Sequence, residues 1–279
     1  MSTAVIEKTN LKLIDVNGRS VSYLEKGTGA PTVYLHGFAD VHGVAGDLLP
    51  FHDKLAGAVR LIVPAHPGCS GTPDLSDGYD IEDAVFHYLE VFDALGLKEF
   101  NLIGHSIGGW IAAEIAVRHP ERVKKLGLIG ACGLFISGEL IADIFMHTQP
   151  ERGVDYDTMR NMLFGDANAA IAQRYYPNGR GDLDEETRRY EIIRFASFVG
   201  FKPPYLYNRS LINRLHRAKM PAAVVWGEKD HFVPRSHGEA YAAGLPGAGK
   251  LKVIAGAGHA AQFENPDAVA EVMLELLKG

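Results

Sequence analysis

One serine in this sequence stands between glycines in a pattern that suits a nucleophile. Residues 104–108 read Gly-His-Ser-Ile-Gly, with Ser106 at the centre. An apolar run of strand length precedes the pattern, and apolar residues with helical spacing follow it. Gly-x-Ser-x-Gly at such a strand-to-helix turn predicts a nucleophile elbow, whose strained backbone lifts the serine hydroxyl clear of the sheet. The positive N-terminal end of the following helix would favour an anion that develops beside the serine.

A base and an acid are available to activate this serine. A serine hydroxyl is protonated at neutral pH, so it needs a base within reach, and the base needs an orienting acid. His259 follows the last predicted strand in a Gly-rich loop, and Asp230 follows the strand before it. Active sites of parallel sheets lie at the carboxyl ends of the strands, so we expect both side chains to meet Ser106 there. Glu228 is the alternative acid.

The elements that must position these residues alternate between strands and helices. A hairpin comes first, because Asn17-Gly18 is a strong turn signal between two strand-like segments. The alternation that follows predicts an α/β fold, a mostly parallel sheet with helices on both faces. Strands are expected at residues 11–16, 19–25, 32–35, 59–63, 100–103, 123–129, 222–226 and 251–254, and helices at 46–55, 80–95, 110–119 and 266–278.

One long segment interrupts the alternation. Residues 134–215 contain no clear buried strand, and residues 140–145 place their apolar side chains on one helical face. Another helix is expected at residues 182–199. The segment is too long for an ordinary crossover, although crossover helices remain the alternative. We therefore predict a helical cap at 134–215, inserted into a core domain made of residues 1–133 and 216–279.

Four motifs in order along the chain resemble the α/β-hydrolase fold superfamily, and in particular its capped esterases and C–C hydrolases with a serine nucleophile. They are residues 36–38, 104–109, 226–234 and 256–259, and the resemblance extends from residue 11 to residue 278. The chain order of serine, acid and histidine is also that of the superfamily. Some members carry the acid one strand earlier, but residues 130–132 contain no carboxylate, which favours Asp230.

This resemblance implies a sheet of the eight-stranded type and a set of roles for the site residues. Ser106 attacks a carbonyl, His259 takes the serine proton, and Asp230 orients the imidazole. The backbone N–H groups of Phe38 and Ile107 are expected to form the oxyanion hole.

The substrate pocket is expected between the cap and the core. Its candidate lining residues are Gly37, Trp110, Met146 and Phe232. For Trp110 and Phe232, a plain place in the hydrophobic core is an equal alternative.

These expectations favour a serine hydrolase that cleaves a small carboxylic ester. The same triad and cap would also serve a C–C bond hydrolase of ring-fission products or an enol-lactonase. C–C hydrolases of this fold often carry an aromatic residue after the catalytic histidine and a Gly-rich oxyanion loop, whereas this chain has Ala260 and residues 38–40 there. A ligand receptor on a hydrolase scaffold is a third possibility, which the complete set of Ser106, Asp230 and His259 disfavours.

The charge and composition of the chain restrict the classes of partner and cofactor that are expected. The formal net charge is −6 over 279 residues, which does not indicate nucleic acid or an anionic membrane surface as a partner. Residues 1–10 do not resemble a signal peptide, and the two cysteines form no disulfide framework, so we expect a cytoplasmic protein. No metal-ligand spacing and no dinucleotide-binding pattern is present, so neither a metal nor a cofactor is expected. The oligomeric state cannot be predicted from the sequence.

Overall fold

A single sheet of eight strands forms the centre of the protein. The structure is a computed structural model that describes residues 11–42, 46–76, 78–148, 154–178 and 182–278. The sheet order is β1-β2-β4-β3-β5-β6-β7-β8; β2 runs antiparallel to both of its neighbours, and all other pairs are parallel. The mostly parallel sheet expected from the sequence is therefore confirmed. The strands are β1 Leu11–Val16, β2 Arg19–Lys26, β3 Pro31–Leu35, β4 Arg60–Pro64, β5 Phe100–His105, β6 Val123–Ile129, β7 Ala222–Gly227 and β8 Lys252–Ile254.

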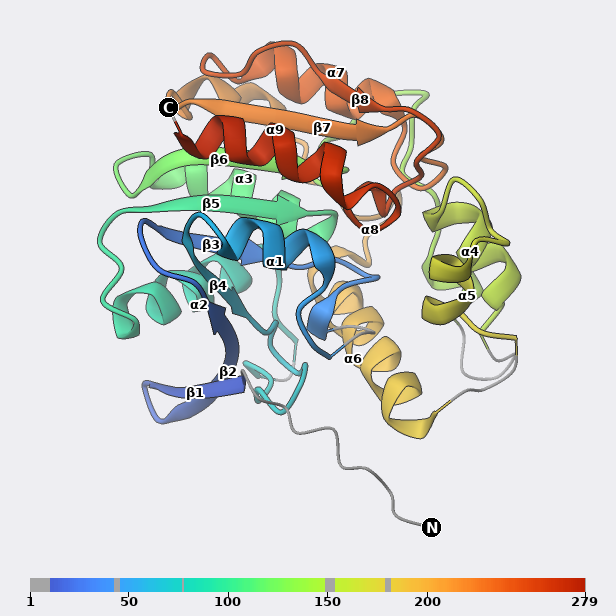
Figure 1. Cartoon of the computed structure of the whole chain (residues 1–279), viewed down its shortest axis with the longest axis horizontal. Coiled ribbons are helices and arrows are strands. Elements are labelled where there is room, and N and C mark those ends of the chain that lie inside the picture. The colour runs from blue at the N-terminus through green and yellow to red at the C-terminus, as the bar shows by residue number, and fades with distance from the viewer. Residues whose placement is uncertain (1–10, 43–45, 77, 149–153, 179–181, 279) are drawn as a thin grey trace.

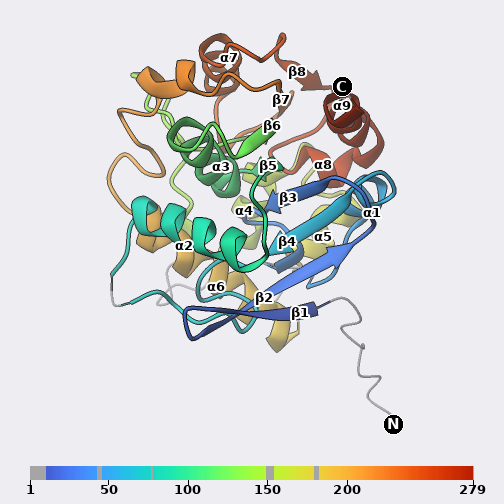
Figure 2. The same cartoon turned by 90° about the vertical axis from the view of Figure 1, so that its left-hand side faces the viewer.

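Helices cover both faces of this sheet (Figures 1 and 2). On one face lie α1 (Pro50–Ala56), α8 (Ala261–Glu264) and α9 (Pro266–Lys278); on the other lie α2 (Ile81–Ala94), α3 (Ile107–Arg118) and α7 (Arg235–Gly244). Successive strand residues point to opposite faces, so each strand supplies two hydrophobic cores. In β5, for example, Leu102 belongs to the core under α2 and α3, and Ile103 belongs to the core under α1 and α9.

Local signals fix several boundaries where the sequence predicts them. Asn17 and Gly18 both adopt positive φ, 53° and 82°, as the hairpin turn requires. The Asp80 side chain caps α2 by accepting hydrogen bonds from the N–H groups of Glu82 and Asp83. Helix α1 starts at Pro50, later than expected, with the proline in the first turn, where its missing N–H costs nothing.

The segment between β6 and β7 is mostly helical, and its helices α4, α5 and α6 lie beyond the carboxyl ends of the strands (Figure 1). In its described part no element is a strand of the sheet. The helix suggested by the periodicity of residues 140–145 is wrong, because the backbone there bonds to other segments: the N–H of Ala142 donates to the carbonyl of Phe232 at 2.9 Å. The elements are a 3₁₀ turn at Phe145–His147, α4 Tyr156–Leu163, α5 Ala170–Tyr175, α6 Leu183–Gly200 and a 3₁₀ helix at Ile212–Arg217.

Within the part of the chain that the structure describes, no helix combines the length and the apolar character needed to cross a bilayer.

Candidate active site

Ser106 occupies the tight turn between β5 and α3. Its φ of 57° and ψ of −120° lie outside the regions that L-residues ordinarily adopt. The flanking glycines make this turn possible, because a Cβ atom on Gly104 would lie 2.3 Å from the carbonyl oxygen of Gly108. A Cβ atom on Gly108 would lie 2.2 Å from the carbonyl oxygen of Leu35. The motif therefore has the compact strand–turn–helix geometry that the sequence predicts.

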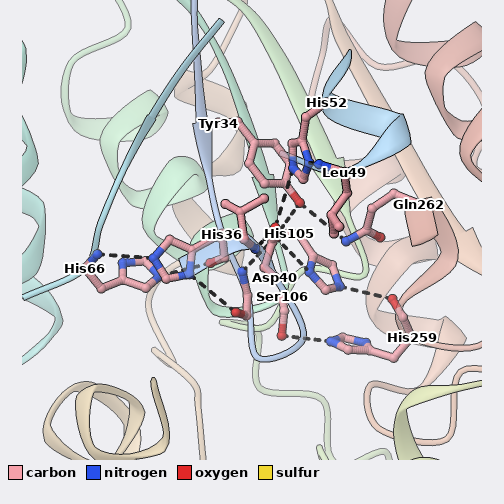
Figure 3. A network of polar contacts seen from close by, with 12 residues as sticks. Tyr34, His36, Asp40, Leu49, His52, His66, His105, Ser106, His259 and Gln262 are labelled. Atoms are coloured by element: carbon pink, nitrogen blue, oxygen red, sulfur yellow. Dashed lines mark hydrogen bonds and ion pairs between the residues drawn. The ribbon is translucent and has the colours of Figure 1, made fainter. Parts of the chain in front are cut away.

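The structure brings Ser106, His259 and Asp230 together in one hydrogen-bonded chain. The Nε2 atom of His259 lies 2.8 Å from Oγ of Ser106 (Figure 3), and its Nδ1 atom lies 2.8 Å from Oδ2 of Asp230. All three side chains are almost fully buried. Such an arrangement can remove a proton from the serine hydroxyl and hold the resulting imidazolium beside a carboxylate.

The loop after β7 holds Asp230 in this orientation. The other carboxylate oxygen of Asp230, Oδ1, accepts hydrogen bonds from the N–H groups of Phe232 and Val233, both at 2.9 Å. The ring of Phe232 packs edge-on against that of His259, with 4.8 Å between centroids. Glu228, the alternative acid, is exposed and accepts instead from the N–H of Gly256 at 2.8 Å.

The backbone N–H groups of Phe38 and Ile107, the two expected oxyanion donors, have no protein acceptor within the described chain. Ile107 is the first residue of α3, where an N–H has no intrahelical partner. Phe38 belongs to the loop after β3, which packs directly against the elbow. A Cβ atom on the preceding Gly37 would lie 2.8 Å from the Cβ of Ser106 and 2.5 Å from Nδ1 of His105.

The four pocket candidates occupy different environments. Gly37 and Phe232 lie at the triad, as their contacts with Ser106 and His259 show. Trp110 is buried in the core, and its indole N–H donates to Glu114 one helical turn further along α3. Met146 is 53% exposed on the segment between β6 and β7. A lining role for these residues stays a prediction.

Cys132 is a neighbour of the serine that the sequence reasoning did not single out. Its Sγ atom lies 3.8 Å from Oγ of Ser106, and burial raises the pKa of this thiol, which keeps it neutral. A signal was present, because Cys132 follows β6 and so stands at the same edge of the sheet as the triad. The neutral sulfur therefore lies against the serine hydroxyl, in a contact in which either atom can be the donor.

Several known proteins are similar to this chain in sequence or in fold. A dihydrolipoyllysine-residue acetyltransferase component of an acetoin cleaving system from Cupriavidus necator is 30% identical over 90% of this chain, which spans only 64% of the length of that relative. A 2-hydroxy-6-oxo-6-phenylhexa-2,4-dienoate hydrolase from Burkholderia cepacia is 28% identical over 99% of both chains. A meta-cleavage product hydrolase from Pseudomonas fluorescens IP01 superposes with a TM-score of 0.74 at 21% identity, covering 96% of this chain and 97% of its own.

The family assignment rests on the match to a family model. Residues 31–266, which include every strand from β4 to β8 and the whole candidate site, match the model of the alpha/beta hydrolase fold. The chain is therefore a member of the alpha/beta hydrolase fold family.

Proposed function

We propose that this protein is a serine hydrolase in which Ser106 is the nucleophile, His259 the base and Asp230 the orienting acid. The observation that carries this proposal is the pair of 2.8 Å contacts that His259 makes, one to the serine oxygen and one to the aspartate. As Ser106 attacks a substrate carbonyl, its proton passes to Nε2 of His259. The Asp230 carboxylate stabilises the imidazolium and fixes its tautomer.

The oxyanion that forms is proposed to accept hydrogen bonds from the N–H groups of Phe38 and Ile107. Both groups are without a protein acceptor in the described chain, and the Phe38 loop packs against Ser106. Donors fixed before the reaction are effective because they need no reorganisation when charge develops; removing one costs about 3–4 kcal/mol in the barrier. His259 then protonates the leaving group and activates a water that releases the acyl group.

The substrate class that the comparisons favour is a 2-hydroxy-6-oxo acid from aromatic ring fission, cleaved at a C–C bond. The relative from Burkholderia cepacia, whose name states this activity, matches along almost its entire length. In this reaction the ketone is attacked, and the carbon leaving group takes its proton from His259. A carboxylic ester is the second candidate, favoured by Ala260, which stands where C–C hydrolases of this fold often carry an aromatic residue.

Two further parts of the proposal concern organisation. Residues 134–215 act as a cap over a core of residues 1–133 and 216–279, since their helices α4, α5 and α6 lie beyond the strand ends that carry the triad (Figure 1). The protein works in a reducing compartment, the cytoplasm, because Cys69 and Cys132 are buried and form no disulfide.

The test compares substrates and variants side by side. The rates of hydrolysis of 2-hydroxy-6-oxo-6-phenylhexa-2,4-dienoate and of p-nitrophenyl esters of increasing acyl length are measured for the wild-type protein and for Ser106→Ala. We expect turnover in the wild type, with the dienoate preferred by kcat/KM, and its near-complete loss in Ser106→Ala. A preference for esters would select the second candidate, and an active Ser106→Ala variant would refute the mechanism.

A further inference from the structure

A second buried carboxylate, Asp40, lies in the loop that carries Phe38. Its Oδ1 atom accepts from the N–H of Val41 at 2.7 Å, and its Oδ2 atom accepts from the N–H of Gly37 at 3.2 Å. The hydroxyl of Tyr34, from β3, also donates to Oδ2 at 2.7 Å (Figure 3). Asp40 is fully buried. Since a buried carboxylate is stable only when its oxygens are satisfied, these donors and the loop conformation depend on each other.

Two histidine rings complete the surroundings of Asp40. Nδ1 of His52 accepts from the N–H of Leu49 at 3.2 Å, so the ring proton sits on Nε2, which lies 3.5 Å from Oδ1 of Asp40. Nδ1 of His105 lies 3.8 Å from Oδ2 of Asp40. Burial by itself would raise the pKa of Asp40, but these imidazoles and the Tyr34 hydroxyl outweigh it and lower the pKa below its ordinary value.

His105 also connects Asp40 to the catalytic histidine. Its other ring nitrogen, Nε2, lies 3.1 Å from the carbonyl oxygen of His259 and must donate to it (Figure 3). His105 directly precedes Ser106 in the elbow. One buried network therefore contacts the Phe38 loop, the residue before the nucleophile and the backbone of the base.

The contacts of Asp40 determine which backbone N–H groups of the Phe38 loop have an acceptor. In the described chain, the N–H groups of Gly37 and Val41 are both directed to Asp40, whereas that of Phe38 has no protein acceptor. Without this carboxylate, the N–H groups of Gly37 and Val41 would lose their acceptor. With it, the segment from Gly37 to Val41 is held at both ends, and the Phe38 N–H within that segment keeps no protein acceptor.

We propose that Asp40 is a positioning residue, which orients the Phe38 N–H for the oxyanion hole by holding the N–H of Gly37, directly before it, and that of Val41, three residues after it. The inference rests on the proposed function, because it assigns a role within the same reaction. Asp40 touches no reacting atom; it acts through the Gly37 and Val41 peptides and, through His105, on the backbone of His259.

The experiment uses a fluorophosphonate probe on the full-length protein, so that no natural substrate is needed. Oγ of Ser106 forms a bond to phosphorus, fluoride leaves with the electron pair of the P–F bond, and the serine proton passes through His259 to solvent. The phosphoryl oxygen occupies the place of the oxyanion. Intact-mass spectrometry gives the limiting rate constant of labelling and, separately, the probe concentration at half that rate.

Asp40→Asn is the principal variant. It keeps the size of the side chain but can accept from at most one of the two N–H groups, since its amide nitrogen is a donor. We expect the limiting rate constant to fall by about 10²-fold, as for loss of one oxyanion donor, and the half-saturating concentration to stay unchanged. Asp40→Glu, which keeps the charge but displaces it by one methylene, should also label more slowly, and it provides the test if Asp40→Asn does not fold.

Controls separate positioning from stability. Val91→Ala removes buried side-chain volume from α2, far along the chain from the loop, and should lower the melting temperature without changing the labelling rate constant. A folded Asp40→Asn or Asp40→Glu variant that labels at the wild-type rate would overturn the role of Asp40. Labelling that persists in Ser106→Ala would instead overturn the proposed function, so the two failures are distinguishable.

Discussion

At the scale of single residues, the strained backbone of Ser106 is held by hydrogen bonds from three directions. Its N–H donates to Ile129 at 2.9 Å, and its carbonyl oxygen accepts from Trp110 at 3.1 Å and from Cys132 at 3.0 Å. A non-glycine residue in such a conformation costs on the order of 1–3 kcal/mol. These hydrogen bonds stabilise the strained turn, and the turn places the hydroxyl of Ser106 next to His259.

The assignment of the acid gives a prediction at this scale. Asp230→Asn should lower kcat by about 10⁴-fold, because an amide facing Nδ1 of His259 favours the wrong imidazole tautomer. Glu228→Gln is the matched control: Glu228 is exposed and bonds to Gly256, so its neutralisation should leave kcat close to wild type. Steady-state kinetics on the best substrate decide the matter. A severe loss in Glu228→Gln together with an active Asp230→Asn would reverse the assignment.

At the scale of elements, the connection between α4 and α5 is joined to the loop that carries His259. The N–H of Ala260 donates to Leu163 at 2.9 Å, and the carboxylate of Glu264 accepts from Gly165 at 2.9 Å and from Gly258 at 2.7 Å. Burial raises the pKa of Glu264 in spite of these N–H donors. The proposed cap is therefore hydrogen-bonded to the loop that carries His259.

Replacing a glycine at this junction tests whether the close approach matters. A Cβ atom on Gly258 would lie 2.5 Å from the nitrogen of Gly165 and 2.8 Å from Cα of Phe164, which are backbone atoms and cannot swing away. Gly258→Ala should lower the free energy of unfolding by about 1–3 kcal/mol and, by shifting His259, lower kcat by up to about 10²-fold.

Gly249→Ala is the control, since a Cβ atom there meets nothing within 4 Å. Urea unfolding and steady-state kinetics should give wild-type values for this variant. A Gly258→Ala variant with wild-type stability and wild-type kcat would show that the two segments can move apart without consequence, so that their close packing is not required.

At the scale of the whole molecule, buried histidines make stability depend on pH. Burial lowers the pKa of His66 and of His87 to about 3. Both ring nitrogens of the neutral His66 have partners: Nε2 contacts the carbonyl oxygen of His36 at 2.9 Å, and Nδ1 contacts the hydroxyl of Tyr88. Both rings therefore stay neutral in the folded protein at pH values where an unfolded histidine, with a pKa of about 6.5, is protonated.

The direction of the effect follows from proton counting. Between about pH 6.5 and pH 3 the unfolded chain binds more protons at these residues than the folded protein does. Their contribution to the free energy of unfolding is therefore complete above pH 6.5 and is lost as the pH falls. Each of the two rings should lower the free energy of unfolding by about 1.4 kcal/mol for every unit by which the pH falls within that window. Urea unfolding from pH 8 to pH 5 measures the slope.

Variants identify the source of this slope. His87→Phe, which removes one buried titrating ring, should reduce the slope of the free energy of unfolding against pH by the amount that one proton contributes. His216→Gln, at an exposed position, should not change this slope. A His87→Phe variant with the wild-type slope would show that His87 is not protonated on unfolding in this range.

The sequence by itself determined the parts that depend on local physics. Short apolar runs specified the strands, Asn17-Gly18 specified a turn with positive φ, and Asp80 specified the start of α2. Ser106, Asp230 and His259 could be named because each follows a strand whose carboxyl end meets the same edge of a parallel sheet. The family match supports the fold on which that reasoning depends. In the structure the three side chains form one hydrogen-bonded chain.

Only the tertiary structure decided the parts that depend on contacts between distant segments. Helix α7 carries two glycines and no apolar stripe, so its sequence does not reveal the crossover that parallel β7 and β8 require. Residues 140–145 have helical periodicity, but the N–H of Ala142 bonds to Phe232 in the Asp230 loop instead. Asp40 shows no motif, because its importance lies in a hydrogen bond from Tyr34 and in the nearby rings of His52 and His105, which the chain brings together on folding. Strand and turn preferences act over a few residues, whereas a buried charge is stabilised by whatever the fold places around it.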